Sequence, residues 1–291
     1  MGEQKGQLLT DLKYLFKGGV LIANALPVIT GFWLAIAFTD YTLGESWGNF
    51  LLVLIGSTLV MAGALTLNNW YDVDIDRIMK RTQKRPTVTG NMSLSSVLTI
   101  GIVLSIIGII FIFFVSIESA IYALVGWVTY VIFYTMWSKR RYTMNTIIGS
   151  ISGAVTPLIG WAVVDDAWHM VPIVVALILF IFQMPHTYAI AIRKYDEYKA
   201  ANVAMLPVVR GYTVTKWHTT FWIACLIPLP FLITELGMLF VVLSTIIHIG
   251  WLILSIVGFF VKDNLKWANG MFKYSVYYLT VMFLMMIVVT I

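Results

Sequence analysis

The chain has 291 residues, of which 60% are hydrophobic and only 11% are charged, and its formal net charge is +5. This composition is typical of membrane proteins, and we expect no nucleic-acid partner. The single cysteine, Cys225, excludes an intramolecular disulfide and a multi-cysteine metal site. Residues 1–17 are polar and lack a short apolar core, so we expect no cleavable signal peptide.

Runs of about 20 apolar residues predict helices that span the membrane, because only a helix satisfies its own backbone in lipid. The predicted fold is therefore all-α, a single membrane domain over residues 1–291 with about nine transmembrane helices. The predicted spans are 18–38, 47–67, 93–115, 117–137, 144–164, 168–192, 215–235, 237–261 and 270–290.

The basic residues predict the orientation of these spans. If the N-terminus is cytoplasmic, all 19 Lys and Arg residues fall in cytoplasmic segments, whereas the charged residues on the opposite side are all acidic. The positive-inside rule thus predicts a multi-pass membrane protein with its N-terminus cytoplasmic and its C-terminus outside. We expect the membrane to be a bacterial plasma membrane. The two long cytoplasmic connections, 68–92 and 193–214, predict an active-site cavity that faces the cytoplasm.

The polar stretch 68–86 follows the second span directly. Asn68, Asp72 and Asp76 are spaced four residues apart, which places them on one helical face, whereas Asp74 faces elsewhere. Two carboxylates and an amide oxygen suit Mg²⁺, which prefers carboxylates together with substrate phosphates. The basic residues that follow suit the phosphates themselves: Arg77, Lys80, Arg81, Lys84 and Arg85. The alternative is a juxtamembrane loop of mixed charge.

A second polar stretch closes the sixth span and continues into the next connection. His186 follows Pro185 inside the apolar run, and Arg193 and Glu197 share its helical face. We consider four roles for His186: an iron ligand, a proton acceptor, a polar substrate contact, or a neutral histidine bonded to a neighbouring helix. Gly149 and Gly153 in the fifth span predict close helix packing.

The first stretch resembles the aspartate motif of the UbiA-type intramembrane prenyltransferases, in its three oxygen residues and in the Arg81-Thr82 and Arg85-Pro86 pairs that follow. Finer details are similar to the haem-modifying branch of this family: Tyr134-Thr135, Lys139-Arg140, Asn145, Thr156 to Trp161, Pro185-His186 and Met205 to Val208. The resemblance covers residues 20 to 290 approximately.

The resemblance implies transfer of a farnesyl group from farnesyl diphosphate to a vinyl group of haem B. It implies that Asn68, Asp72 and Asp76 hold Mg²⁺ on the diphosphate, and we predict Lys199 and His186 as further catalytic residues. The predicted substrate-binding residues are Arg77, Lys80, Arg81, Arg85, Lys139, Arg193, Lys194, Asp196, Glu197 and Tyr134. The expected partners are both substrates, the lipid bilayer and the enzyme that next modifies the haem.

One feature departs from much of the family, which carries a second pair of aspartates at four-residue spacing. At that spacing this chain offers Arg193 with Glu197 or Asp196 with Ala200. Neither pair has two carboxylates, which puts a second Mg²⁺ in doubt.

Departure of the diphosphate leaves an allylic cation, which a cavity must keep from water and which aromatic faces stabilise. Trp70, Tyr71, Tyr134 and Tyr188 are the candidates. Two other functions remain open: a prenyltransferase acting on a quinone precursor, and a secondary transporter. A transporter would need ionisable groups near the bilayer midplane, whereas nearly all charges here lie at the membrane edges.

Overall fold

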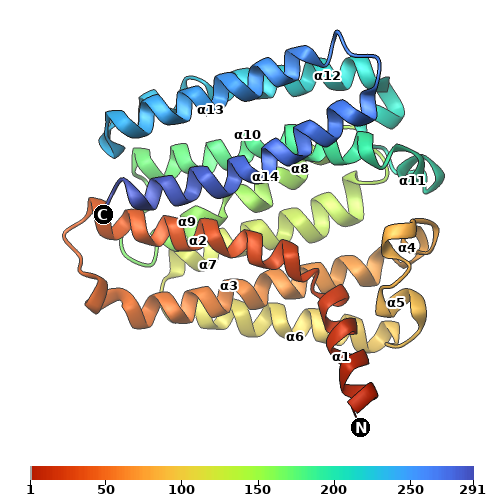
Figure 1. Ribbon diagram of the computed structural model, residues 1–291. Helices are drawn as coiled ribbons and strands as arrows, with labels where there is room; N and C mark the ends of the chain where they lie inside the picture. The colour runs from red at the N-terminus through yellow and green to blue at the C-terminus, as the bar shows by residue number, and fades with distance from the viewer. Residues whose placement is uncertain (1) are drawn as a thin grey trace.

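The computed structural model describes residues 2–291 and the side chains of residues 6–291. Met1 of the predicted domain and the side chain of Lys5, one of the predicted cytoplasmic basic groups, lie outside the described residues. The described chain is a bundle of helices, which confirms the predicted all-α class (Figure 1). Its nine main segments are α2 (Gly18–Phe38), α3 (Leu43–Tyr71), α6 (Leu94–Phe113), α7 (Ile117–Val128) continued by the π-helix η2 (Thr129–Ser138), α8 (Asn145–Ala154) continued by α9 (Thr156–Trp161), α10 (Met170–Arg193), α12 (Leu206–Leu226), α13 (Met238–Val257) and α14 (Asn264–Val288).

Seven helices within residues 2–291 are each long and apolar enough to cross a membrane. The other two predicted spans are interrupted. Between α8 and α9, Val155 separates the two helices, and Gly211 in α12 has the non-helical angles φ 80° and ψ 173°. Glycine adopts this left-handed backbone at little steric cost, so the helix axis changes direction there.

The seventh predicted span, 215–235, is displaced along the sequence. Helix α12 begins at Leu206, with Pro207 in its first turn, and ends at Leu226. Pro228 and Pro230 follow, and proline removes the amide that a continuing helix needs. The chain there forms the short 3₁₀ helices η3 (Leu229–Leu232) and η4 (Thr234–Leu236) instead.

Two helix pairs approach closely because glycines face backbone. A Cβ on Gly160 of α9 would lie 1.9 Å from the carbonyl oxygen of Val28 in α2, and one on Gly31 of α2 would lie 2.0 Å from that of Pro157. Gly63 of α3 likewise faces the backbone of α6. Small residues at helix crossings let backbones approach in a membrane, where no hydrophobic force drives helices together.

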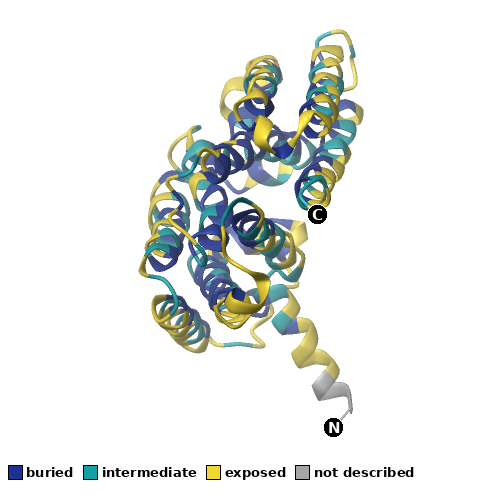
Figure 2. Cartoon of the chain, turned by 90° about the vertical axis from the view of Figure 1, so that its left-hand side faces the viewer, coloured by how far each residue is buried: buried dark blue, intermediate teal, exposed yellow. Residues whose placement is uncertain are grey.

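Helix α10 lies within the bundle and packs against α8, α12 and α14. Apolar side chains also cover the outer faces of the bundle, such as Ile106 of α6, Phe221 of α12 and Ile253 of α13, which are all exposed (Figure 2). Helices that are apolar inside and outside belong in lipid.

One end of the bundle carries the polar connections (Figure 1). The short helices α4 (Val73–Ile78), η1 (Lys80–Thr82), α5 (Pro86–Thr89) and α11 (Tyr195–Ala200) lie there. Helix α1 (Gly2–Leu15) lies at this end, at an angle to the bundle, and extends away from the other helices (Figure 1). Its Leu8 and Leu9 are exposed, as in a helix that lies at a membrane surface.

Candidate active site

The residues of the first polar stretch lie where α3 ends and α4 begins. Helical hydrogen bonds continue across this junction, because the amide of Asp72 donates to Asn68 O and that of Asp76 to Asp72 O, each at 2.9 Å. The side chains of Asn68, Asp72 and Asp76 therefore share one face and are all buried, as the four-residue spacing predicts. Asp74 points away, with 61% of its side chain exposed.

The amide of Asn68 has a fixed orientation. Its Nδ2 donates to Asp72 Oδ2 at 2.7 Å and to Thr135 Oγ1 at 3.1 Å. Its Oδ1 is thereby left to face the cavity, where it accepts from the Lys17 ammonium. An amide so held presents an oxygen, the atom that a hard cation requires.

Each of the three oxygen residues contacts a basic side chain. Lys17 donates to Asn68, Lys139 to Asp72, and Arg85 to Asp76. Arg140 also reaches Asp72 Oδ1, at 3.4 Å, and makes a bidentate pair with Asp74 at 2.6 and 2.7 Å. The charges of Asp72, Asp76 and the lysines beside them are close together and largely shielded from solvent, so each depends on its neighbours.

The pKa values report this crowding. Burial raises the pKa of Asp76, against the opposing effect of Arg85 and Lys17. Burial and the nearby charges of Arg85 and Lys139 hold the pKa of Lys17 well below its usual value. For Lys139, burial opposes the charge but Asp72 outweighs it, so its pKa lies above the usual value. An added anion would favour the charged form of each lysine.

These side chains line a polar cavity of about 190 Å³ at the mouth of the bundle. Its polar walls are Lys17, Asn68, Asp76, Arg81, Arg85, Lys139 and the tyrosines Tyr130, Tyr134 and Tyr198.

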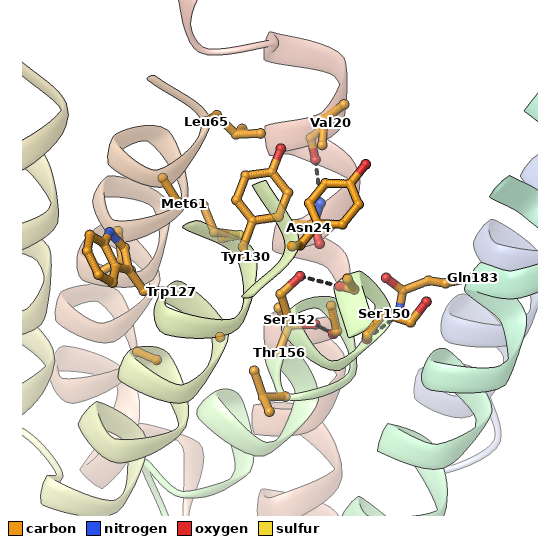
Figure 3. A pocket seen from close by; sticks show the side chains of 18 of the residues that line it. Val20, Asn24, Met61, Leu65, Trp127, Tyr130, Ser150, Ser152, Thr156 and Gln183 are labelled. Carbon is orange, nitrogen blue, oxygen red and sulfur yellow. Dashed lines mark hydrogen bonds between the residues drawn. The ribbon is translucent and has the colours of Figure 1, made fainter. Parts of the chain in front are cut away.

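A larger chamber of about 260 Å³ continues from the polar cavity, with which it shares Val20, Leu65, Tyr130 and Tyr134. Side chains of α2, α3, α7, η2, α8, α9 and α10 converge on it (Figure 3). Deeper walls include Met61, Trp127 and Ile159, so the chamber becomes apolar away from the charged mouth. The two spaces fit a molecule with an anionic head and an apolar tail.

The π-helix η2 brings three of these side chains into place. The hydrogen bond that defines its wider turn runs from the Lys139 amide to Tyr134 O, five residues back, at 2.9 Å. Tyr130 and Tyr134 thus line the chamber while Lys139 reaches Asp72. Gly149 leaves room for the Tyr134 ring, which a Cβ there would meet at 2.8 Å, and Gly153 does the same for Gln183. The predicted close packing at these glycines is thus against side chains.

The sequence has relatives that identify its family. The model of the UbiA prenyltransferase family matches residues 24–285. The chain belongs to the UbiA prenyltransferase family. It is 50% identical to a protoheme IX farnesyltransferase of Oceanobacillus iheyensis over 99% of this chain and 92% of that protein. It is 47% identical to protoheme IX farnesyltransferase 2 of Bacillus subtilis over 96% of this chain and 92% of that one.

Solved structures share the UbiA fold. That of a UbiA homologue from Archaeoglobus fulgidus bound to DMAPP and Mg²⁺ superposes with a TM-score of 0.71 at 18% identity, covering 95% of this chain and 99% of that one. Membership of the family confirms that the chain is a multi-pass membrane prenyltransferase.

Hydrogen bonds from helix α11 hold the loop that carries Arg81 in position. The hydroxyl of Tyr198 accepts from the Arg81 guanidinium at 2.9 Å, and Glu197 Oε2 accepts from the Arg81 amide at 3.4 Å. Lys194 pairs with Glu197 at 2.9 Å. Two of the predicted substrate-binding residues, Lys194 and Glu197, are thus placed to position a third.

Other predicted residues lie apart from both cavities. Arg77, Lys80, Asp196 and Lys199 are exposed. Arg193 stacks on the Phe272 ring at 4.0 Å, and its Nε donates to Asn269 Oδ1.

His186 lies on the face of α10 that packs against α14. Its Nδ1 is 2.7 Å from Ser275 Oγ, and its ring lies between Phe182 and Phe272. Its neighbours in the sequence, Gln183 and Thr187, line the apolar chamber instead.

Five residues of the site were not predicted from the sequence as site residues: Lys17, Tyr130, Arg140, Tyr198 and Trp127. The first three stand in stretches that also match the positive flank or aromatic belt of an ordinary membrane helix. The signal that could have found Tyr130 is its spacing of four residues from Tyr134.

The donor set fits Mg²⁺. No group of three His, Cys, Asp or Glu residues occurs in the part of the chain that the structure describes, so an all-protein cage is absent from that part. Two buried carboxylates and an oriented amide oxygen beside a phosphate-sized polar cavity are instead the partial shell that Mg²⁺ takes when substrate phosphates complete it.

Proposed function

We propose that this chain transfers the farnesyl group of farnesyl diphosphate to a vinyl group of haem B, which yields haem O. The support for the acceptor is the name, protoheme IX farnesyltransferase, that relatives at 46–50% identity carry over nearly the whole chain. That name favours haem over the alternative of a quinone precursor. Family membership leaves the transporter alternative without support.

The observation that carries the donor half is the continuity of the charged cavity with the apolar chamber. A diphosphate fits among the cations at the mouth, and the isoprenoid tail fits the apolar walls beyond Tyr130 and Tyr134. The reacting carbon would then lie near these two tyrosines, inside the helix bundle, where contact of the cation with water must be limited.

Asn68, Asp72 and Asp76 would hold Mg²⁺, which would neutralise the diphosphate and make it a better leaving group. Arg81, Arg85 and Lys139 line the same cavity and would bind the remaining phosphate oxygens. Positive groups placed in advance stabilise the charge that develops as the carbon–oxygen bond breaks.

The faces of Tyr130, Tyr134 and Trp127 would stabilise the allylic cation that remains. A carbon–carbon bond then forms to the vinyl group of the haem. Water adds its oxygen to the neighbouring vinyl carbon and releases a proton, so the product carries a hydroxyl. The diphosphate that left in the first step is the other product.

The acceptor half of the site rests on the second polar stretch. The family resemblance supports assigning His186 and Arg193, which pack against α14, to the haem side. We assign Lys194 and Glu197 to positioning of Arg81, and Asp196 and Lys199 to the entrance that both substrates pass. We also propose that the N-terminus is cytoplasmic and the C-terminus is outside, in a bacterial plasma membrane. The partner that receives the product would be the enzyme that next modifies the haem.

The test is extraction of pigments after overexpression of the chain in a bacterium that makes haem B. A haem heavier by a farnesyl group and a hydroxyl group should appear in the mass spectrum, and a metal chelator should abolish its formation in membranes. Prenylated quinone precursors in place of the farnesylated haem would overturn the acceptor.

A further inference from the structure

Lys17 occupies an unusual backbone position. It joins α1 to α2 with φ 49° and ψ 54°, the left-handed region that side chains with a Cβ rarely adopt. The two glycines that follow, Gly18 and Gly19, are not in this region. Backbone strain of this kind persists where the surrounding structure holds it in place, and it gathers at functional sites.

The surrounding structure does hold the junction. Asn69 Nδ2 donates to Leu15 O at 2.7 Å and to Tyr14 O at 3.4 Å, which ties the end of α1 to the buried end of α3. Asn91 Nδ2 also donates to Asp11 of α1, at 3.0 Å. The Lys17 side chain is therefore directed into the polar cavity, where it reaches Asn68.

Each of the three oxygen residues contacts one cation that lines the polar cavity. Lys17 contacts Asn68, Lys139 contacts Asp72, and Arg85 contacts Asp76. An oxygen that accepts from an ammonium or guanidinium group binds a metal ion less well, because the two cations repel each other and compete for the same oxygen. The same three side chains line the space where the diphosphate would lie.

We propose that Lys17 is a diphosphate-binding residue that alternates between two partners, the Asn68 oxygen and a phosphate oxygen, in exchange with the metal ion. With a metal–diphosphate bound, Asn68 would hold the metal ion through its oxygen, and the Lys17 ammonium would donate to a phosphate oxygen instead. Lys139 and Arg85 make the same exchange at Asp72 and Asp76. This inference rests on the proposed function only in that a metal and a diphosphate share this cavity.

The exchange predicts that loss of the Lys17 amine changes the affinities for the metal ion and for the diphosphate in opposite directions. Removal of the Lys17 amine takes away a competitor of the metal, so a metal ion without diphosphate should bind more tightly. The same change removes a charge-assisted hydrogen bond to phosphate, which is equivalent to about a tenfold or greater loss of affinity. A residue with a merely structural role would weaken both ligands together.

The experiment measures two affinities in the purified protein: Mn²⁺ alone, by electron paramagnetic resonance, and inorganic pyrophosphate in the presence of Mg²⁺, by calorimetry. Lys17→Met should bind Mn²⁺ several-fold more tightly and pyrophosphate about tenfold more weakly. Lys13→Met is the matched control, because Lys13 is exposed on α1 and outside the polar cavity, and it should change neither affinity.

Lys17→Gly serves if the methionine variant folds poorly. Glycine adopts a φ of 49° without strain, so this variant should be at least as stable as the wild type and still show the opposite changes. Equal loss of both affinities, or no change in pyrophosphate affinity, overturns the proposal. Failure of the wild type to bind pyrophosphate with Mg²⁺ would instead refute the diphosphate site itself.

Discussion

The crossing of α2 and α9 supports a quantitative prediction at Gly160. A Cβ there would lie 1.9 Å from Val28 O and 2.9 Å from both Val28 C and Phe32 N, all backbone atoms. Close carbon–oxygen contacts are about 3.3 Å, so Gly160→Ala must separate the helices by roughly 1.4 Å. Overpacking of this kind costs about 1–3 kcal/mol or more, against about 0.5–1 kcal/mol that alanine gains over glycine in a helix.

We therefore expect Gly160→Ala to lower the midpoint of thermal unfolding by about 2–4 °C for each net kcal/mol of destabilisation. The assay is the fraction of monodisperse protein left after heating in detergent. Gly270→Ala on α14 is the control, because its Cβ would meet nothing nearer than Leu254 Cδ1 at 4.0 Å. The control should keep or raise the midpoint.

The same displacement should reach the active site. Thr156 and Ile159 of α9 line the apolar chamber together with Val20 and Asn24 of α2. Gly160→Ala should accordingly raise the KM for farnesyl diphosphate, and the size of the increase follows how far α2 moves. An unchanged unfolding midpoint in Gly160→Ala would refute the close-contact reasoning.

Three further predictions concern chemistry and topology. Asp76→Asn should lower turnover about a hundredfold or more, because it weakens charge stabilisation at the leaving group. Asp74→Asn should lower turnover far less, because Asp74 is exposed. Equal losses of turnover by both variants in a membrane assay would count against the metal-site assignment. His186→Gln should weaken haem binding, measured by absorption titration, while farnesyl diphosphate affinity stays near normal, and the reverse pattern would remove His186 from the acceptor side. Thiol labels at cysteines placed near Lys84 and Asn202, with the native cysteine replaced, should react only from the cytoplasm, and reaction from outside would overturn the orientation.

Much of the metal-site geometry followed from spacing alone. Four-residue intervals place Asn68, Asp72 and Asp76 on one face, and the structure shows the three side chains buried together with Asp74 outside. This worked because helical hydrogen bonds continue through the junction of α3 and α4, so simple periodicity holds there.

Lys17 could not be found in the same way. Its position just before a membrane helix is explained equally well by the positive-inside rule, and its backbone angles depend on tethers from Asn69, 52 residues further along the chain. Long-range hydrogen bonds of this kind leave no local pattern in a sequence.

His186 shows a second limit. The sequence placed it within the sixth span, but a residue in an apolar helix has lipid, cavity and neighbouring helices around it, and periodicity does not say which it faces. Contacts with Ser275 and Phe272 show that His186 faces the neighbouring helix α14, and these residues lie nearly 90 positions away in the sequence.

The π-helix η2 lets the chain hold an extra residue at one place in the candidate site. The Lys139 amide donates to Tyr134 O, five residues back, where an α-helical amide would donate four residues back. Deletion of one residue between 129 and 133 would let this turn relax to α-helical geometry, so the helix on either side would keep about its present orientation. Trp127 would then stay in the chamber wall although it stood one residue closer to Lys139 in the sequence. A comparison of UbiA sequences that allows gaps only in loops would therefore misalign the chamber while scoring every helix as intact.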